Sequence, residues 1–374
     1  MFRRLLGFSL LLLLWGAPAW QQQAIAAPDR RFIQNLQVEW INEFILPAQT
    51  FESTTVGGLS AITYDRKTGK FYALSDQHGS GQAHFYTLNL EITDAGITSA
   101  QIEAVTYLSD AAGNRYGGAF DPEGMALTPQ GSLYVSSEGN PEQSLGPGLT
   151  EFDLKTGQQL RSLPIPEHFQ PAENQGVQAN RGFESLTLGL GGTASSEPLH
   201  VFTATEGPLL QDKTANSVNA TPRNRFLHYY RDGGDDSQPL VLGEYVYELD
   251  PAPGALIHGL SEILALDGNG HFLGLERAFS PLVFQVKLFQ FSLAGASDVS
   301  SRPALQGNLR GVEPIHKQLV MDLSRLDKLR LDNLEGMTWG PQLADGSRSL
   351  ILISDDNFKS FEKTQLLLFK VRLS

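Results

Sequence analysis

The chain has 374 residues, no cysteine and a formal net charge of −13 at pH 7. The acidic balance argues against partners that carry their own negative charge, so neither nucleic acid nor an anionic membrane surface is expected. The lack of cysteine excludes disulfide bonds and thiolate ligands, while the length is ample for a buried core without such cross-links.

Residues 1–26 have the layout of a secretory signal peptide. Two arginines precede an apolar run at 5–15, and small residues before Ala27 provide a cleavage site. The alternative, an uncleaved membrane anchor, is disfavoured because the run is shorter than the ~20 residues that span a bilayer. We therefore expect a secreted or periplasmic mature domain at 27–374. It is predicted to be a monomer with no membrane span after signal cleavage.

The next element is an apolar strand at 36–47, LQVEWINEFILP, and from residue 60 on one pattern occurs five times. Each copy opens with a short strand, whose starts lie 63, 61, 78 and 73 residues apart, at 60–64, 123–127, 184–188, 262–266 and 335–339. A turn rich in Gly and Asp follows. Then comes a second strand that ends in an acidic residue, at 72–76, 134–138, 202–206, 272–276 and 351–355.

Two further strand-like runs complete most copies, and four antiparallel strands per repeat are the unit of a β-propeller blade. The last copy has only one such run, QLLLFKVRL, before the chain ends. The chain is therefore predicted to be all-β: a single propeller of five four-stranded blades, closed by the 36–47 strand as the missing strand of the last blade. Six blades are the alternative, because 208–260 and 280–333 are long enough to hold another.

Acidic residues recur at two positions of the repeat. One set begins the first strand, where only Ser60 departs from the pattern: Glu123, Glu184, Glu262 and Glu335. The other set ends the second strand: Asp76, Glu138, Glu206, Glu276 and Asp355. The start of one antiparallel strand lies beside the end of the next, so both sets are expected to meet at one mouth of the central channel.

So many carboxylates in one place repel each other, and a bound cation relieves the repulsion. Calcium is the predicted cofactor, since it takes 6–8 oxygen ligands. The predicted metal ligands are Glu123, Glu184, Glu262, Glu335, Asp76, Glu206 and Asp355. Glu138 or Glu276 would position water, and Arg277 would hold a substrate anion. In the alternative interpretation, each acid only accepts hydrogen bonds from the next blade, as an inter-blade contact.

The loops beyond the acid-ending strands differ between copies and provide candidate substrate-binding residues: His78, Asn140, Arg181, Asn357 and Lys359. Other chemistry is absent from the sequence. It contains no Gly-x-Ser-x-Gly elbow, no phosphate-binding loop, no dinucleotide fingerprint and no zinc spacing.

The segments GGLSAITYD, DPEGMAL, NRGFESLTL, FLGLERAF and NLEGMTWGP together resemble the phytase-like family of exported bacterial proteins, also described as "esterase-like activity of phytase". The resemblance covers roughly residues 50–373. It implies an exported propeller that hydrolyses esters or phosphoesters and, by analogy with β-propeller phytases, binds calcium. The chain lacks the DDP segment of those phytases, which argues against phytate itself as the substrate.

Two functions are consistent with these observations. In the first, the chain is an exported hydrolase of a small-molecule ester or phosphoester, assisted by a divalent cation at the acidic mouth. In the second, it is a non-catalytic exported propeller that binds a ligand or partner, and its repeated acids are mainly structural contacts between blades.

Overall fold

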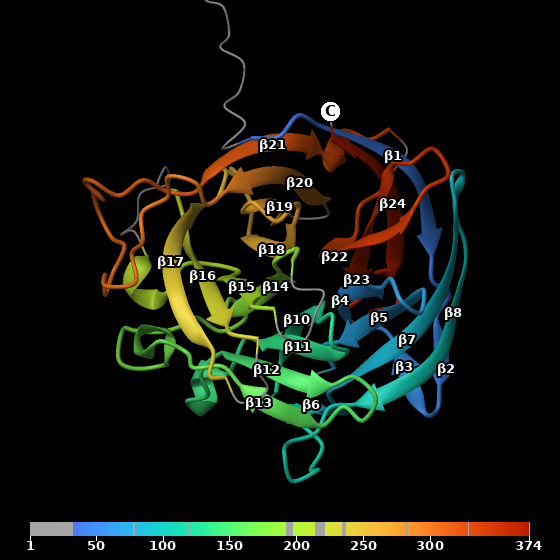
Figure 1. The fold of residues 1–374 in the computed structure, drawn as a ribbon, viewed down its shortest axis with the longest axis horizontal. Coiled ribbons are helices and arrows are strands. Elements are labelled where there is room, and N and C mark those ends of the chain that lie inside the picture. Colours follow the sequence, from blue (N-terminus) through green and yellow to red (C-terminus); the bar gives the residue numbers. More distant parts are fainter. Residues whose placement is uncertain are drawn as a thin grey trace, which may run out of the picture.

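The computed structural model describes residues 33–77, 79–118, 120–191, 197–213, 221–233, 237–280, 283–327 and 329–373. Five four-stranded antiparallel sheets form a ring around a central axis (Figure 1). The prediction of an all-β, five-bladed propeller is confirmed, and the six-bladed alternative is wrong. The predicted signal peptide lies outside the described residues.

The blades are numbered 1 to 5 from β4 onward, and their strands run outward from the axis. The innermost strands are β4 (Leu59–Asp65), β10 (Pro122–Leu127), β14 (Phe183–Leu188), β18 (Ile257–Ala265) and β22 (Asn333–Gln342). The second strands are β5 (Lys70–Ser75), β11 (Ser132–Ser137), β15 (Leu199–Thr205), β19 (His271–Ser280) and β23 (Arg348–Asp355). The third strands are β7 (His84–Thr93), β12 (Gly148–Asp153), β16 (Arg223–Arg231), β20 (Val283–Ser292) and β24 (Gln365–Leu373). The outer strands are β8 (Gly96–Tyr107), β13 (Gln159–Ser162), β17 (Leu240–Glu248), β21 (His316–Asp322) and β1 (Leu36–Ile45).

Short elements connect the blades. Two small ribbons pair β2 (Gln49–Phe51) with β3 (Thr54–Val56) and β6 (Gly79–Gln82) with β9 (Gly117–Gly118). Within the described ranges, the helices are single 3₁₀ turns: η1 (Pro141–Gln143), η2 (Glu167–Phe169), η3 (Leu210–Asp212) and η4 (Leu323–Arg325). Across the described part of the chain, no helix has the length and apolar character needed to span a bilayer.

The ring is closed by the two ends of the described chain. β1 pairs antiparallel with β24, from Leu36 opposite Leu373 to Ile45 opposite Gln365. The last blade therefore has the order β22, β23, β24, β1 from the axis outward, as predicted. This closure gives β24 hydrogen-bonding partners on both sides and leaves no gap between the first and last blades.

Turn chemistry explains why the hairpins form where they do. Between β4 and β5, the carboxylate of Asp65 accepts hydrogen bonds from the Lys67 amide (2.8 Å) and the Thr68 hydroxyl (2.7 Å). Gly69 follows with a φ of +74°, a left-handed conformation that side chains with a Cβ disfavour. The sequence DRKTGK thus reverses the chain and sets the register of the first hairpin.

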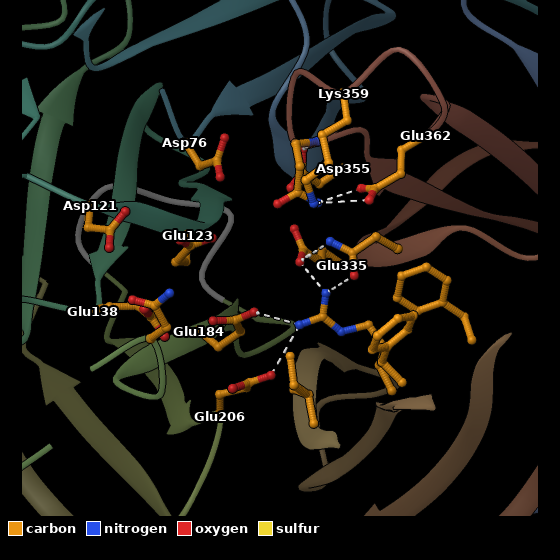
Figure 2. A pocket seen from close by; sticks show the side chains of 17 residues that line it. Asp76, Asp121, Glu123, Glu138, Glu184, Glu206, Glu335, Asp355, Lys359 and Glu362 are labelled. Carbon is orange, nitrogen blue, oxygen red and sulfur yellow. Dashed lines mark hydrogen bonds and ion pairs between the residues drawn. The ribbon is translucent and has the colours of Figure 1, made fainter. Parts of the chain in front are cut away.

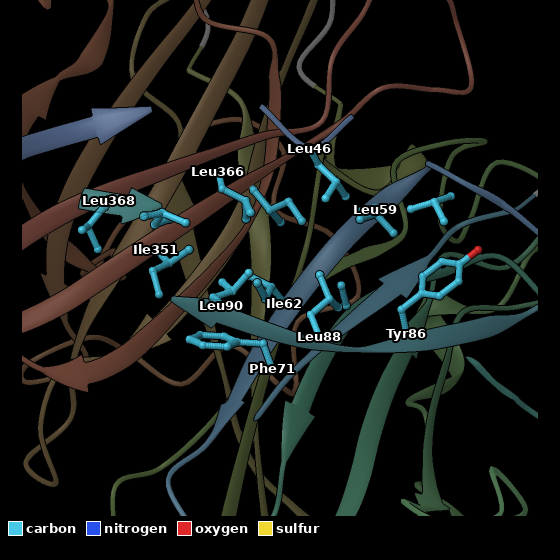
Figure 3. Packing of buried hydrophobic residues seen from close by; sticks show 14 residues of the cluster. Leu46, Leu59, Ile62, Phe71, Tyr86, Leu88, Leu90, Ile351, Leu366 and Leu368 are labelled. Carbon is cyan, nitrogen blue, oxygen red and sulfur yellow. The ribbon is translucent and has the colours of Figure 1, made fainter. Parts of the chain in front are cut away.

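Each of the five interfaces between neighbouring blades has its own hydrophobic cluster. Between blades 5 and 1, Ile62 and Phe71 pack against Ile351, Leu366 and Leu368 (Figure 3). Burial of such side chains contributes about 1.5–3 kcal/mol each. These apolar clusters hold each blade against its neighbours around the ring.

Candidate functional site

The first hairpin of every blade carries a β-bulge in its innermost strand, at equivalent positions of the five blades. A bulge sets two residues of one strand against one of its partner and re-aims a side chain. The shifts in strand register locate it, in all five blades, at a serine or a glutamate: Ser60, Glu123, Glu184, Ser261 and Glu335. These residues form an inner ring of equivalent positions.

A second ring follows from the same strand pairing. In blade 3, the residue before the bulge pairs with Thr205, which directly precedes Glu206. In blade 4, the equivalent residue pairs with Glu276, so Arg277 occupies the position of an acid. The second ring therefore consists of Asp76, Glu138, Glu206, Arg277 and Asp355.

Blade 4 thus differs by one residue from the register expected from its sequence. A shift of one residue turns every side chain of a strand to the opposite face. Ser261 and Arg277 hold the ring positions that were predicted for Glu262 and Glu276. Neither of those two glutamates lines the cavity described below.

Glu262 instead connects two blades. It is 2% exposed, and its carboxylate accepts hydrogen bonds from the Leu186 amide of blade 3 (3.0 Å) and from the amide of Ile263 (2.9 Å). Burial raises the pKa of Glu262 well above its ordinary value, although these backbone bonds act to lower it. For this residue the structure matches the inter-blade contact of the alternative interpretation.

Replacing Glu262 with alanine is expected to lower the free energy of unfolding by about 2–4 kcal/mol, because the Leu186 amide loses its buried acceptor. Urea denaturation measures the loss. Glu262→Gln keeps an oxygen acceptor and is expected to lose less. A stability unchanged in Glu262→Ala would show that the bond to Leu186 contributes nothing.

Glu276 also belongs to a structural network. Its carboxylate accepts hydrogen bonds from the Tyr247 hydroxyl (3.0 Å), the Asp250 amide (2.9 Å) and Lys317. Burial alone would raise the pKa of Glu276, but the bonds from His258 and Lys317 outweigh it and hold the pKa below its ordinary value. Its partners are therefore already in place, on the face of blade 4 away from the rings.

Eight of the ten ring residues, all except Ser60 and Ser261, line a cavity of about 270 Å³ (Figure 2). Nine of its lining residues are acidic and two are basic. The lining consists of Asp76, Asp121, Glu123, Glu138, Asn180, Glu184, Glu206, Ile257, Arg277, Phe279, Phe284, Asn333, Glu335, Asp355, Asn357, Lys359 and Glu362.

The structure brings most, but not all, of the predicted site residues into this cavity. The predicted metal ligands that line it are Asp76, Glu123, Glu184, Glu206, Glu335 and Asp355. The other predicted residues that line it are Glu138, Arg277, Asn357 and Lys359. Asn140 instead caps η1, accepting a bond from the Gln143 amide (3.2 Å), and Arg181 donates to the His258 carbonyl (2.9 Å). His78 lies outside the described residues.

Several lining residues were not among the predicted ones. Asp121 lies two residues before Glu123, and Asn333 lies two residues before Glu335. This shared offset is visible in DPEGMAL and NLEGMTW, and it would have identified both. Asn180, Glu362 and the apolar residues of the lining have no such repeat in the sequence.

Arg277 is the main compensating charge. Its guanidinium pairs with Glu335, and with Glu206 at 3.1 Å and Glu184 at 3.8 Å. It also donates to the amide oxygen of Asn333. Burial acts to lower the pKa of Arg277, but the neighbouring carboxylates outweigh it and hold the pKa above its ordinary value. Arg277 therefore stays charged and compensates one side of the cavity.

Five carboxyls of the cavity have raised pKa values. Burial is the largest cause and repulsion between neighbouring carboxylates the next, and together they raise the pKa of Glu138 to about 8. Burial raises the pKa of Glu335 to about 7, even though Arg277 acts to lower it. Burial and neighbouring acids also raise those of Glu123, Glu184 and Asp355 well above ordinary. Protons therefore compete with any cation for these oxygens.

Asp121, Glu123 and Glu138 form the tightest group of acids, and each brings one carboxylate oxygen to within 4.8 Å of the other two. Calcium–oxygen distances are 2.3–2.6 Å, so two ligands of one ion lie no more than about 5 Å apart. The three carboxylates therefore fit a divalent cation, and a set of oxygen donors favours calcium or magnesium over softer metals. Figure 2 places this group across the cavity from Glu335 and Glu362.

The family model "Phytase-like: Esterase-like activity of phytase" matches residues 54–358. The chain belongs to the phytase-like family. Among curated proteins, none matches it in sequence.

Solved structures align with this phytase-like chain at low identity and with TM-scores below 0.5. The catalytic domain of the Coprinopsis cinerea GH62 α-L-arabinofuranosidase aligns with a TM-score of 0.42 and 12% identity, over 87% of this chain and 95% of that one. Kuenenia stuttgartiensis hydrazine synthase aligns with a TM-score of 0.34 and 11% identity, over 84% of this chain and 62% of that one. The tail fibre of Staphylococcus aureus phage P68 aligns with a TM-score of 0.37 and 14% identity, over 90% of this chain and 52% of that one.

Proposed function

We propose that this phytase-like chain is an exported monomeric enzyme, mature from residue 27, that hydrolyses a small-molecule ester or phosphoester with the aid of a divalent cation. The observation that carries the proposal is the group formed by Asp121, Glu123 and Glu138 in the wall of a concave cavity. Membership of a family described by an esterase-like activity supports the reaction class. Calcium is the proposed cation because all three donors are carboxylates.

Different residues of the cavity are proposed to bind the cation, transfer the proton and bind the substrate. Asp121, Glu123 and Glu138 would hold the cation, which when bound supplies Lewis acidity toward a carbonyl or phosphoryl oxygen and a more acidic water. Glu335 is suited to accept a proton from the attacking water, because its pKa of about 7 lies near the working pH. Lys359, whose side chain is 46% exposed, lies at the cavity and is suited to bind an anionic substrate group.

A non-catalytic binding propeller is the second candidate, and one contact favours it. The carboxylate of Glu138 accepts a hydrogen bond from the Gly182 amide of the next blade at 3.0 Å. This bond joins blades 2 and 3 directly, with no cation between them. An acid of the second ring can therefore be retained for structural reasons alone.

The test combines a ligand measurement with an activity measurement. Thermal unfolding is recorded in excess EDTA and then with calcium or magnesium, and 4-nitrophenyl esters and phosphoesters are screened under both conditions. A cation at a hundredfold excess over its Kd is expected to stabilise the native protein by about 2.7 kcal/mol. Cation-dependent hydrolysis would support the enzyme. Stabilisation without hydrolysis of any ester would support the binding propeller, and no stabilisation would overturn the cation site.

Calcium affinity is expected to fall as the pH is lowered from about 9 to 6. The ligands must be ionised to bind, and Glu138 has a pKa of about 8, so below that pH calcium has to displace its proton. Each displaced proton weakens the apparent affinity by about tenfold per pH unit below the pKa. Calorimetric titration at several pH values measures this slope. An affinity independent of pH would mean that Glu138 is not a ligand.

A further inference from the structure

Blade 4 is built differently from the other blades at the mouth of the cavity. In blades 1, 2, 3 and 5, the second strand ends at the ring acid or one residue before it. In blade 4, β19 continues three residues past Arg277 to Ser280, and β18 begins at Ile257, four residues before its bulge. The hairpins of this blade therefore extend beyond the rings and form one wall of the cavity.

This extension presents apolar side chains to the cavity. Ile257 lies directly opposite Phe279, and Phe279 lies directly opposite Phe284 in the next strand. Residues that face each other across antiparallel strands point to the same side of the sheet. All three line the cavity, and the two phenyl rings lie 5.0 Å apart.

Ile257 and Phe279 are not part of the hydrophobic core. Ile257 is 46% exposed, and neither it nor Phe279 belongs to a hydrophobic cluster, whereas Phe284 packs partly against the cluster between blades 4 and 5. Apolar groups beside nine carboxylates gain nothing for stability by facing water. Such surface is typical of ligand sites, which combine an apolar wall with a few polar groups.

The cavity is thus divided by chemistry. Blade 2 supplies the carboxylates of Asp121, Glu123 and Glu138, while blade 4 supplies the apolar wall, with Arg277 at its base. A ligand that is charged on all sides would leave the apolar side chains of the wall exposed to water. A ligand with one oxygen-rich group and one apolar group matches both halves of the cavity.

We propose that Ile257, Phe279 and Phe284 form a subsite for an aryl or branched-alkyl group of the substrate. The inference deepens the proposed function by naming the substrate class, an ester with one bulky apolar substituent next to the scissile bond. The subsite itself is a binding property, so it is testable without turnover and without a cation.

Binding of 2-naphthol, the alcohol half of a 2-naphthyl ester, tests the subsite. The Kd is measured by equilibrium dialysis of the purified protein in EDTA, for wild type, Phe279→Ala and the milder Ile257→Ser. Leu240→Ala is the matched control, because Leu240 is 59% exposed on the outer strand of blade 3. Removing Phe279 is expected to raise the Kd by about tenfold, since aromatic side chains contribute strongly to apolar ligand contacts. Ile257→Ser should raise it by a smaller factor, and Leu240→Ala should leave it unchanged.

The outcomes separate this inference from the proposed function. A Kd that rises in Phe279→Ala and Ile257→Ser but not in Leu240→Ala supports the subsite, even if no ester is hydrolysed. No binding to the wild type, or equal binding to all variants with unchanged melting temperatures, overturns it, even if other esters are hydrolysed. If Phe279→Ala unfolds, Ile257→Ser decides alone. When turnover is found, kcat/KM for 2-naphthyl acetate should fall in Phe279→Ala more than kcat/KM for methyl acetate.

Discussion

Arg277→Met is expected to lower the free energy of unfolding by about 3–5 kcal/mol at pH 8 in the absence of divalent cations, the usual cost of removing one partner of a buried ion pair. Arg277 is 9% exposed and pairs with Glu335, Glu206 and Glu184. Without it, Glu335 and Glu184 lose their arginine partner, and Glu206 keeps only the longer contact with Arg181 at 3.7 Å. Chemical denaturation in EDTA measures the loss.

Three comparisons show whether the loss comes from charge. Arg325→Met removes an ion pair with Asp322 whose arginine side chain is 85% exposed, and it is expected to change stability by less than about 1 kcal/mol. Arg277→Lys keeps the charge but not the planar fork, so it should lie between wild type and Arg277→Met. Lowering the pH to about 5 should shrink the loss, because the carboxylates take up protons. Equal losses in Arg277→Met and Arg325→Met would refute the compensating role.

The five-bladed propeller could be predicted from the sequence because the same strand pattern occurs five times. Five copies of a strand, turn and acid-ending strand predict five blades without knowledge of any contact. The strand at 36–47 stands outside the copies and has one vacant place to fill, beside β24. The five blades and the closing strand both follow from local sequence pattern and from the need to close the propeller, and the structure shows both.

The position of single side chains in blade 4 could not be predicted in the same way. The acids that end FLGLE and YALSD predict equivalent ring positions for Glu276 and Asp76, yet Glu276 lies one residue too early for the ring. The apolar residue before each bulge is the better guide: Leu260-Ser261 aligns with Phe183-Glu184. Strand faces alternate residue by residue, so a plausible alignment on charge places the functional side chain on the wrong face.

The positions of loop side chains were harder to predict than those of the strands, because many of their contacts join segments that are distant in sequence. Asn140 is an exception, because Asn140-Pro141-Glu142-Gln143 has the pattern of a helix start, with Asn at the N-cap and Pro at the first helical position, and the structure shows that cap. The apolar wall depends on the length of β18 and β19 past the rings, which local pattern does not reveal. Only the strand pairing places Ile257 beside Phe279.

Glu123→Gln is expected to have two opposite effects, and together they identify Glu123 as a cation ligand. In EDTA at pH 8 the variant should be more stable than wild type by about 1–3 kcal/mol, because a carboxyl with a raised folded-state pKa loses stability as the pH rises above its unfolded value. Burial and the neighbouring acids Glu184, Asp76, Asp121 and Glu138 raise the pKa of Glu123 well above ordinary. Near pH 4.5, where the unfolded carboxyl also takes up protons, this advantage should vanish.

With saturating calcium the order should reverse, because the amide of Glu123→Gln supplies no negative charge to the cation. The calcium-induced rise in melting temperature expected for the wild type should be lost or much reduced, because the number of charged ligands sets the affinity of a calcium site and affinity sets the stabilisation. Glu91→Gln, whose side chain is exposed near the end of β7, is the control for the change in net charge and should behave like wild type at each pH. A variant that is destabilised in EDTA and keeps its full calcium response would make Glu123 a structural contact and would leave the other acids of the cavity to hold the ion.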